Sequence, residues 1–317
     1  MSFKITGTGS YAASRIVTND NLAETLDTSD EWITQRVGIR ERRVSETESA
    51  AEMGCKAALR ALEMSGRQVS DVDLIIAASL TCDTLCPTLA GTVQELLGAH
   101  CPAFDINSAC SGFLFALDTA AGFFARGKAK CALVIGAERM SKLVDWTDRS
   151  TCVIFGDGAG AAVLEEGDSY LVSKLSTAGG SDVIRIPSGT DNSPYYKKET
   201  ESARIFMDGQ ETFKFAVNKI TGDIKELLQK AEYSADDIKY IVPHQANIRI
   251  IQYASKRLGV PIEKFFVNIE KYGNTSAASI PMALDELNRQ KGLERGDLIA
   301  MSAFGGGLSS AACIIKW

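Results

Sequence analysis

Hydrophobic positions with a helical period alternate along this chain with short, continuous apolar runs. An amphipathic helix is predicted from Thr47 to about Gly66, and an apolar run follows it at 71–77. A second helix is predicted from Gly209 to about Lys230, and a second apolar run follows at 237–243. Apolar runs of this length between helices are typical of strands covered on both faces. The pattern therefore predicts an α/β protein.

The two helix–strand pairs are separated by a constant offset, since 237 − 71 = 166. The same offset places the predicted strand 130–137 on 296–303, and it places Cys110 on Ser276. A repeat this long is not a solenoid unit, whose period is a few tens of residues. It predicts a duplicated pair of α/β units whose pseudo-twofold arrangement brings their reactive loops close together.

The chain has no linker rich in Pro, Gly or Ser, so the two predicted halves, 1–168 and 169–317, are expected to pack as one body. Residues 179–202 show little periodicity and are expected to form a surface loop or flap. The apolar stretch from Cys110 to Ala125 contains Asp118 and is too short to cross a bilayer, so we expect a helix buried on most sides.

Composition narrows the class of protein. The chain has 317 residues, of which 45% are hydrophobic and 23% charged, as in an ordinary globular protein. Its net charge of −6 argues against general nucleic-acid binding. The first residues show no charged segment followed by an apolar one, so no signal peptide and a cytoplasmic location are expected, without membrane association.

Cysteine and histidine usage argues against disulfides and metals. The eight cysteines include no Cys-x-x-Cys pair, which is typical of a reduced interior rather than a disulfide framework. With only two histidines and no paired cysteine ligands, no metal site is expected.

Cys110 is the candidate nucleophile. It follows a short predicted strand, 104–106, and precedes the predicted buried helix. A thiol at a helix N-terminus meets the positive end of the helix dipole, which is expected to lower its pKa, and its own amide can face an oxyanion. The alternative is a small buried hydrophobic residue. That alternative is favoured for the other seven cysteines.

His244 and Asn274 are the candidate partners of this thiol. His244 follows Pro243 at the end of an apolar run, where ligand sites of α/β proteins gather. The alternative for His244 is a hydrogen-bonded core residue. Asn274 follows Gly273, and this pair alone indicates only a tight turn. The repeat, which aligns the Asn274 loop with the Cys110 loop, favours a functional role.

Two glycine runs have different interpretations. The run from Gly156 to Gly160 resembles a dinucleotide-binding fingerprint, but an apolar strand rather than a helix is predicted after it, so that function is excluded. The run from Gly305 to Gly307 precedes the last strand, and its amides are candidates for a second oxyanion donor.

Taken together, the motifs resemble those of the β-ketoacyl-acyl carrier protein synthase III family from Gly7 to Trp317. They are 27–32 (DTSDEW), 37–42 (VGIRER), 108–113 (SACSGF), 155–161 (FGDGAGA), 243–247 (PHQAN), 273–278 (GNTSAA) and 304–307 (FGGG). The resemblance implies a thiolase-like fold, two duplicated α/β halves packed as a five-layer αβαβα sandwich, and a homodimer.

The resemblance also implies a mechanism without a cofactor. Cys110 would take an acyl group from an acyl-CoA primer, and the amides of Cys110 and Gly306 would hold the oxyanion. Malonyl-acyl carrier protein would then lose carbon dioxide while His244 and Asn274, as neutral donors, hold its thioester oxygen. The product would be a 3-ketoacyl chain on the carrier protein, the first step of fatty acid synthesis.

The family pattern assigns substrate contacts in three groups. The nucleotide of CoA would meet Thr28, Trp32, Arg36 and Arg149, whereas the pantetheine channel would be lined by Gly209, Phe213, Ala216 and Asn247. Phe304 and Cys86 would bound the acyl pocket, Cys86 from across the dimer. Trp32 could alternatively be a core residue. Cys86 replaces the large aromatic residue of many acetyl-specific relatives, which leaves room for a longer or branched primer.

A basic surface for the acidic carrier protein is expected on the helix after His244. Arg249 and Lys256 are seven residues apart and share a face opposite the apolar one, and Lys214 and Arg257 extend it. The alternative is an ordinary solvated helix face. Two other functions remain open: a related condensing enzyme of secondary metabolism, and a non-catalytic partner subunit, which the presence of Cys110, His244 and Asn274 disfavours.

Overall fold

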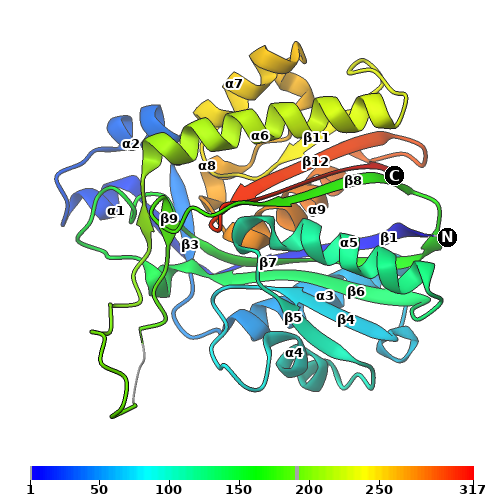
Figure 1. Cartoon of the computed structure of the whole chain (residues 1–317), viewed down its shortest axis with the longest axis horizontal. Coiled ribbons are helices and arrows are strands. Elements are labelled where there is room, and N and C mark those ends of the chain that lie inside the picture. The colour runs from blue at the N-terminus through cyan, green and yellow to red at the C-terminus, as the bar shows by residue number, and fades with distance from the viewer. Residues whose placement is uncertain (1, 190–192) are drawn as a thin grey trace.

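The fold is a stack of three helical layers and two sheets. It is seen in a computed structural model that describes residues 2–189 and 193–317. Figure 1 shows two sheets lying face to face, with helices between them and further helices on each outer side. This arrangement is the predicted five-layer αβαβα sandwich.

The first sheet has five strands in the order β1-β7-β6-β4-β5. The central strands are buried on both faces, because helices cover both sides of the sheet. Their bounds are β1 (Ser2–Ala12), β4 (Leu74–Ala78), β5 (Ala103–Ile106), β6 (Cys131–Arg139) and β7 (Asp157–Gly167). Since β7 begins at Asp157, inside the glycine run from Gly156 to Gly160, the prediction of a strand rather than a helix at this run is confirmed.

The second sheet repeats the first with one strand fewer. Its order is β11-β12-β13-β8, and each pair of neighbours has the same parallel or antiparallel sense as its counterpart in the first sheet. The fifth strand is reduced to a single bridge between Ile241 and Phe265. Its strands are β8 (Tyr170–Thr177), β11 (Tyr240–Pro243), β12 (Leu298–Gly305) and β13 (Ser309–Lys316). The duplication is confirmed.

Three of the hydrophobic clusters correspond to the three helical layers. The largest lies between the sheets around α5 and α9, one packs α3 and α4 on the first sheet, and one packs α6 and α7 on the second. The bounds are α3 (Ala50–Ser65), α4 (Leu89–Leu97), α5 (Gly112–Ala125), α6 (Gly209–Lys230), α7 (Ile248–Leu258) and α9 (Ser279–Lys291). The helices predicted from Thr47 and from Gly209 are thus confirmed.

Capping residues set the ends of these helices. Ser49 and Glu52 form a capping box at the start of α3, which ends at Gly66 with a φ of 71°. Asn247 caps α7 by accepting a hydrogen bond from the Arg249 amide, and that helix ends at Gly259.

The Asp118 carboxylate in the middle of α5 accepts hydrogen bonds from Tyr170 and Ser173 of the second sheet, which explains a charge in this buried helix.

Smaller elements complete the fold. They are β2 (Arg15–Thr18), β3 (Glu41–Val44), β9 (Ile184–Arg185), β10 (Phe206–Met207), α1 (Asn19–Ala23), α2 (Asp30–Val37), α8 (Ile269–Tyr272) and the 3₁₀ turns η1 (Val69–Asp71), η2 (Ala109–Ser111), η3 (Met140–Leu143), η4 (Ile262–Lys264) and η5 (Ser276–Ala278). The predicted loop 179–202 is irregular apart from β9 where it is described. Met1 and residues 190–192 lie outside the described residues.

The predicted offset of 166 residues is wrong by one in the reactive loops. Leu74 of β4 corresponds to Tyr240 of β11, which is the predicted offset of 166 residues (240 − 74). In the neighbouring parallel strands, Leu74 pairs with Ala132 of β6 and Tyr240 pairs with Ile299 of β12. These two partners are 167 residues apart (299 − 132). The turns η2 and η5 begin at Ala109 and Ser276, also 167 apart (276 − 109). The second half therefore contains one more residue than the first between β11 and the turn η5. With the offset of 167, Cys110 corresponds to Ala277 rather than to Ser276.

No helix among the residues that the structure describes is long and apolar enough to span a bilayer.

Candidate active site

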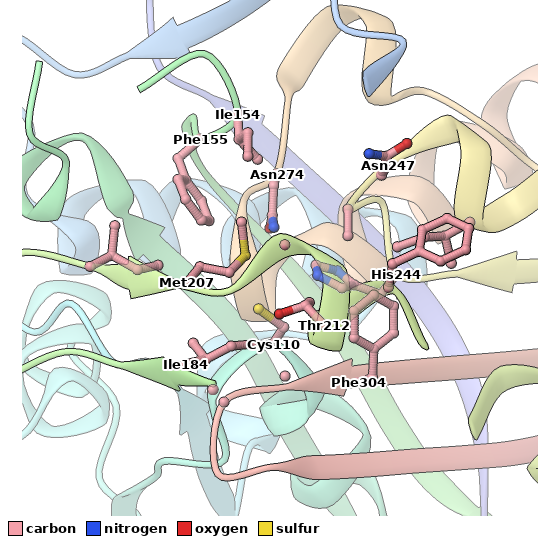
Figure 2. Close-up of a pocket in the computed structure, with 18 of the residues that line it drawn as sticks. Cys110, Ile154, Phe155, Ile184, Met207, Thr212, His244, Asn247, Asn274 and Phe304 are labelled. Atoms are coloured by element: carbon pink, nitrogen blue, oxygen red, sulfur yellow. The ribbon is translucent and has the colours of Figure 1, made fainter. Parts of the chain in front are cut away.

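A cavity of about 1070 Å³ lies where the carboxyl ends of β11 and β12 meet the start of α5. The predicted catalytic residues Cys110, His244 and Asn274 all line it. Figure 2 shows their side chains around one space, each projecting from a different element. The cavity is larger than two other cavities of the described residues, of about 240 and 460 Å³, and it lies at the strand ends where α/β proteins bind ligands.

Cys110 is the middle residue of η2, the turn that leads directly into α5. The thiol is only partly exposed, on the wall of the cavity. The prediction that the helix N-terminus lowers its pKa is wrong for the resting protein. Loss of bulk water by burial raises the pKa of Cys110 to about 12, and the charge of Glu138 raises it further, whereas the Ser276 hydroxyl and the Cys110 amide act in the opposite direction.

His244 follows β11 and is 1% exposed. Its amide donates to the Ser302 carbonyl of β12 at 2.8 Å, which fixes the backbone, and the Phe304 ring meets the imidazole edge-on at 5.3 Å between centroids. Burial lowers the pKa of His244 to about 3, so the imidazole is neutral at physiological pH. Nδ1 has no hydrogen-bond partner among the described residues. A neutral imidazole can donate one N–H to a substrate oxygen.

Asn274 is held by its backbone and by one side-chain oxygen. Its amide donates to the Ile154 carbonyl at 2.9 Å, and its carbonyl accepts from Gly156 at 3.1 Å. Its side-chain oxygen accepts a hydrogen bond from the Ser276 amide at 2.8 Å. Because the oxygen is occupied in this way, the NH₂ group is the end that points into the cavity in Figure 2. The tight turn suggested by Gly273, whose φ is 66°, is present as well.

The glycine run of the last hairpin lies against the thiol. A Cβ added to Gly305 would lie 2.7 Å from the Cys110 amide nitrogen, so only glycine allows this approach. Gly306, the predicted second oxyanion donor, lines the same cavity. The arrangement places main chain from the two halves side by side at the nucleophile.

Trp32 of α2 lines the cavity, and two guanidinium groups lie near its ring. Arg149 lies 4.8 Å and Arg36 5.2 Å from the ring centroid. The ring is partly buried and packs against the hydrophobic cluster beside α2, so Trp32 contributes to that core as well as lining the cavity. A flat aromatic surface flanked by cations suits a nucleotide with phosphates.

The remaining predicted contacts fall into two groups. Those that line the cavity with the residues already described are Gly209, Phe213, Lys214, Asn247, Arg249 and Phe304. Five do not line it: Thr28, Cys86, Ala216, Lys256 and Arg257. Lys256 is exposed on α7, as expected for a surface contact, and exposed Cys86 was expected to act across a dimer.

Neither Ala216 nor Thr28 lines the cavity, and the prediction that Ala216 lines the channel is wrong. Ala216 is fully buried, because it lies one turn beyond Phe213 on the face of α6 that packs on the second sheet. Thr28 lies in the turn before α2, where its hydroxyl is buried and has no hydrogen-bond partner among the described residues.

Sequence reasoning missed Glu138, a fully buried carboxyl at the end of β6 whose charge acts on Cys110. Its sequence signal is a single acid at the end of an apolar run, within 131–139. It also missed Ile184 of β9 and Met207 of β10, which line the cavity near the thiol (Figure 2). No motif marks those two positions.

Solved structures define the class of the protein. The crystal structure of 3-oxoacyl-[acyl-carrier-protein] synthase III from Aquifex aeolicus is 44% identical, with a TM-score of 0.93 over 99% of this chain and 100% of that chain. The priming β-ketosynthase from the R1128 polyketide pathway is 35% identical, with a TM-score of 0.92 over 99% of this chain and 96% of that chain. The chain is thus a condensing acyltransferase with a thiolase-like fold.

Sequence comparison defines the family. The models for the 3-oxoacyl-[acyl-carrier-protein] synthase III domain and for its C-terminal domain match residues 104–182 and 228–317. The β-ketoacyl-[acyl-carrier-protein] synthase III of Clostridium acetobutylicum is 46% identical over 100% of this chain and 99% of that protein. The chain belongs to the β-ketoacyl-acyl carrier protein synthase III family.

Proposed function

We propose that this chain condenses an acyl-CoA primer with malonyl-acyl carrier protein through an acyl group held on Cys110, as the first step of fatty acid synthesis. The observation that carries the proposal is the meeting of a thiol, a neutral imidazole and a carboxamide in one cavity. Two neutral donors without a carboxylate partner suit the stabilisation of an oxyanion better than the relay of a proton. The alternative that this chain is a non-catalytic partner subunit loses support, because Cys110, His244 and Asn274 all line the same cavity.

The proposed reaction has two halves. In the first, the Cys110 sulfur bonds to the primer carbonyl carbon and CoA leaves as its thiol, with the amides of Cys110 and Gly306 donating to the tetrahedral oxyanion. In the second, malonyl-acyl carrier protein loses carbon dioxide while His244 and Asn274 donate to its thioester oxygen. The resulting carbanion attacks the acyl carbonyl, the C–S bond to Cys110 breaks, and the leaving thiolate takes up a proton from water to restore the thiol. No cofactor takes part.

The proposed substrate path follows the cavity outward. CoA would stack its base at Trp32 beside Arg36 and Arg149, and its pantetheine arm would pass Gly209, Phe213 and Asn247. The primer would end near Phe304 and, in a dimer, near Cys86 of the partner subunit. Malonyl-acyl carrier protein would dock on the basic surface formed by Lys214, Arg249, Lys256 and Arg257.

Two features support a homodimer. Strand β5 is the edge of the first sheet, with unpaired main-chain groups along one side. Leu85, in the loop that carries Cys86, is 99% exposed, which is unusual for a leucine and is relieved by a partner surface. Sedimentation of the purified chain tests this assignment.

Intact mass spectrometry tests the function. The chain is mixed with acetyl-, butyryl- and isobutyryl-CoA, and the adduct is mapped by peptide digestion. We expect one acyl group on Cys110 and none on Cys110→Ala. Absence of an adduct with every primer contradicts the proposal. The likeness to a polyketide-priming synthase keeps secondary metabolism as a second candidate, which is favoured if the acylated chain condenses with another acceptor and not with malonyl-acyl carrier protein.

A further inference from the structure

A buried arginine that pairs with no carboxylate lies against the chain around Asn274. Arg42, the last residue of the motif 37–42, has no solvent exposure and is one of the largest fully buried side chains among the described residues. Within residues 2–189 and 193–317 it forms no ion pair, and its neighbour Glu41 pairs instead with Arg43 at 3.0 Å. A guanidinium keeps its charge when it is buried, and a buried charge is costly unless it is well bonded.

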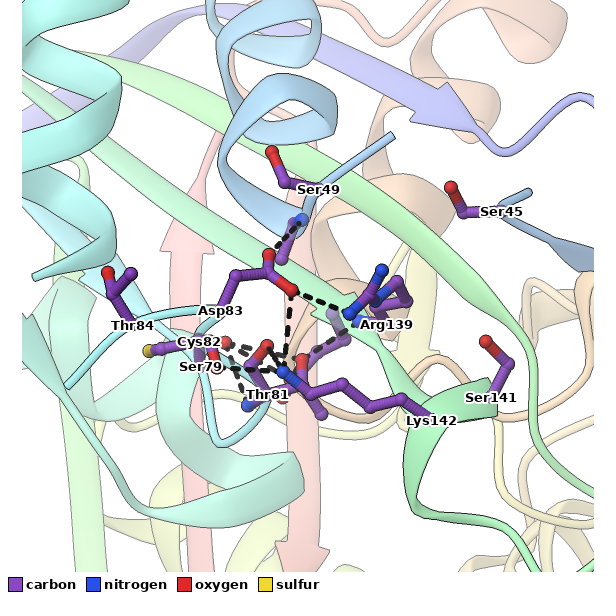
Figure 3. A network of polar contacts seen from close by, with 12 residues as sticks. Ser45, Ser49, Ser79, Thr81, Cys82, Asp83, Thr84, Arg139, Ser141 and Lys142 are labelled. Atoms are coloured by element: carbon purple, nitrogen blue, oxygen red, sulfur yellow. Dashed lines mark hydrogen bonds and ion pairs between the residues drawn. The ribbon is translucent and has the colours of Figure 1, made fainter. Parts of the chain in front are cut away.

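Two other cations of the same half have a carboxylate partner. Arg139 pairs with Asp83 at 2.7 Å, and Lys142 lies 3.6 Å from the same carboxylate (Figure 3). Lys142 also donates to the main-chain carbonyls of Thr81 and Cys82, so this pair of cations holds the loop after β4. The described partners of the Arg42 guanidinium are all neutral oxygens, so its role is to hold the segments that supply them.

The Arg42 guanidinium joins the β2–β3 pair to the cavity wall. It donates to the Val17 carbonyl at 3.1 Å, to the Asn19 side-chain oxygen at 2.8 Å and to the Val153 carbonyl at 2.9 Å. Val17 is the cross-strand partner of Arg42, and Asn19 follows β2 directly. Val153 is 111 residues away in the sequence and lines the cavity. The bond to Val153 therefore ties a distant segment to this arginine.

Val153 leads into the segment that holds the main chain of Asn274. The next residue, Ile154, accepts a hydrogen bond from the Asn274 amide at 2.9 Å. Phe155 forms a parallel bridge with Asn274, and Gly156 donates to the Asn274 carbonyl at 3.1 Å. The direction of the Asn274 side chain depends on this main chain, so it depends on where the segment 153–156 lies.

Close contacts on both sides make this coupling stiff. A Cβ added to Gly156 would lie 3.2 Å from the Arg42 Cβ, and one added to Gly273 would lie 3.5 Å from it. The same added atoms would lie 2.2 Å from the Tyr272 carbonyl oxygen and 2.6 Å from the Ile154 carbonyl oxygen. Arg42 and the two segments are therefore in direct contact. In an interior packed this tightly, a shift of one segment moves the other.

We propose that Arg42 is a positioning residue for malonyl decarboxylation, which fixes Val153 and, through the bridge at Phe155, the direction of the Asn274 amide group. Arg42 itself does not touch the substrate and takes no proton. The inference rests on the proposed function, in which Asn274 donates to the malonyl thioester oxygen. Loss of Arg42 should impair the half-reaction that uses Asn274 and spare the acylation of Cys110, which does not.

A second arm of the same network leads toward the nucleotide contacts. Asn19 donates to the Asp30 carboxylate of α2 at 2.8 Å, and α2 also carries Trp32. If Arg42 served this arm instead, its loss would raise KM for acetyl-CoA and leave decarboxylation intact. The direct bond to the cavity wall and the contacts with both glycines favour the arm that leads to Asn274.

A double-mutant cycle tests the proposal. Arg42→Lys keeps the charge but loses the planar fork that spans Asn19 and Val153, and Arg42→Met removes the charge and the donors. Each change is made in the unmodified chain and in Asn274→Ala. We expect decarboxylation of malonyl-acyl carrier protein to fall about tenfold in Arg42→Lys and about a hundredfold in Arg42→Met, the effect of a displaced group at a reacting centre. In Asn274→Ala neither change should slow it further, because the group that Arg42 positions is absent.

Two further measurements separate positioning from general stability. Acylation of Cys110 and KM for acetyl-CoA should stay nearly unchanged in Arg42→Lys. Hydrogen exchange should rise in peptides that cover 153–157 and 272–276, because the bonds between these segments loosen. Arg42→Lys, which keeps a buried cation with donors, decides the matter if Arg42→Met does not fold.

Asp223→Asn is the matched control for lost stability. Asp223 is a buried charge on α6 that pairs with Lys174 at 2.9 Å, and it does not line the cavity. This variant should lower Tm as the Arg42 variants do, while decarboxylation and the hydrogen exchange of 153–157 stay as in the unmodified chain.

Three outcomes overturn the inference. They are an equal fall in decarboxylation with and without Asn274, a fall in acylation as large as that in decarboxylation, and unchanged decarboxylation in Arg42→Lys and Arg42→Met, with or without a rise in KM for acetyl-CoA. A different result contradicts the proposed function itself: the unmodified chain does not decarboxylate malonyl-acyl carrier protein, or Asn274→Ala does so at the full rate.

Discussion

Asn107 and Asn274 occupy equivalent positions in the two halves of the chain, 167 residues apart. Each accepts, through its side-chain oxygen, a hydrogen bond from the amide two residues later: Ala109 at 3.2 Å and Ser276 at 2.8 Å. Those two residues have φ values of 47° and 49°, which residues other than glycine rarely adopt. A side-chain oxygen that bonds to the backbone two residues on is how asparagine stabilises such turns.

The same turn thus serves two purposes. In the first half it presents the thiol of Cys110, and in the second half it presents the amide group of Asn274 itself. The turns η2 and η5 pack against each other, so the duplication brings two copies of one local structure to the same cavity.

The first prediction separates the two half-reactions. His244→Ala and Asn274→Ala should each slow malonyl decarboxylation on the order of a hundredfold or more, because each removes a donor to the thioester oxygen. Acyl transfer to Cys110 should largely survive. Acylation is measured by intact mass and decarboxylation by release of carbon dioxide. His100→Ala, at the exposed second histidine, is the matched control. Equal loss of both half-reactions would show that the roles are misassigned.

The second prediction concerns pH. Because the pKa of His244 is lowered to about 3, the imidazole stays neutral throughout the range in which an ordinary histidine titrates. The decarboxylation rate of pre-acylated enzyme should therefore show no step between about pH 5 and 8. As pH falls through about 6.5 the unfolded chain takes up a proton at His244 and the folded chain does not, so acid destabilises the fold there. A step near pH 6.5 that His244→Asn abolishes would contradict this assignment.

The repeat could be predicted from the sequence because it rests on hydrophobic pattern. The helices from Ser49 and Gly209 and the strands after them follow from periodicity and capping residues, and their equal spacing indicates the duplication. The one-residue shift in the reactive loops could not be seen this way, since η2 and η5 have no periodicity. The asparagines at 107 and 274 are the sequence signal for this shift. Recognising them requires knowing that each asparagine side chain accepts a hydrogen bond from the amide two residues later.

The electrostatics of Cys110 could not be predicted from its place in the sequence. The position of Cys110 before a helix indicates that the helix dipole lowers its pKa. It does not indicate how deeply the thiol is buried, and burial raises the pKa by more than the dipole lowers it. The same limit applies to Ala216, which is the correct residue type on the correct helix but lies one turn too deep. Depth along a cavity depends on tertiary packing, which a linear pattern does not contain.

The third prediction tests the contact between the last hairpin and the thiol. Gly305→Ala would place a methyl group 2.7 Å from the Cys110 amide nitrogen and 3.1 Å from its Cβ, so the turn must move. We expect acylation to fall by about a hundredfold, since small displacements at a reacting centre have effects of this size. Gly222→Ala is the matched control, because a Cβ there meets nothing within 4 Å, and it should stabilise α6 by about 0.5–1 kcal/mol. Unchanged acylation in Gly305→Ala would mean that the hairpin is free to shift.

The fourth prediction concerns the nucleotide end of the cavity. Trp32→Ala removes the ring that lies near Arg36 and Arg149 and should raise KM for acetyl-CoA about tenfold or more, the usual size of a lost base–aromatic stack. With acetyl-pantetheine, which has no base, the variant and the unmodified chain should behave alike. Trp146→Ala, at a partly exposed tryptophan that does not line the cavity, is the control. An equal loss with both substrates would indicate a structural role for Trp32.

The last prediction concerns the carrier protein. Arg249 is exposed at the start of α7 and lines the mouth of the cavity, and within the described part of the chain it forms no ion pair. Ile250, Ile251 and Ala254 face the core, so the basic side of the helix is free to meet a partner. An acidic chain that receives an acidic carrier protein needs such a local positive surface. Arg249→Glu should weaken condensation with malonyl-acyl carrier protein, most strongly at low salt, where charges are least screened.

Acylation of Cys110 by acetyl-CoA should stay nearly intact in Arg249→Glu, because that step does not use the carrier protein. Lys128→Glu makes the same change of charge just beyond the far end of α5 and should alter neither reaction. The two variants are compared by their KM for malonyl-acyl carrier protein over a range of salt concentrations. A local ionic contact weakens as salt screens it and depends on where the charge lies. The docking surface therefore lies elsewhere if the rise in KM of Arg249→Glu does not shrink as salt is added. The same conclusion follows if Lys128→Glu shows an equal rise.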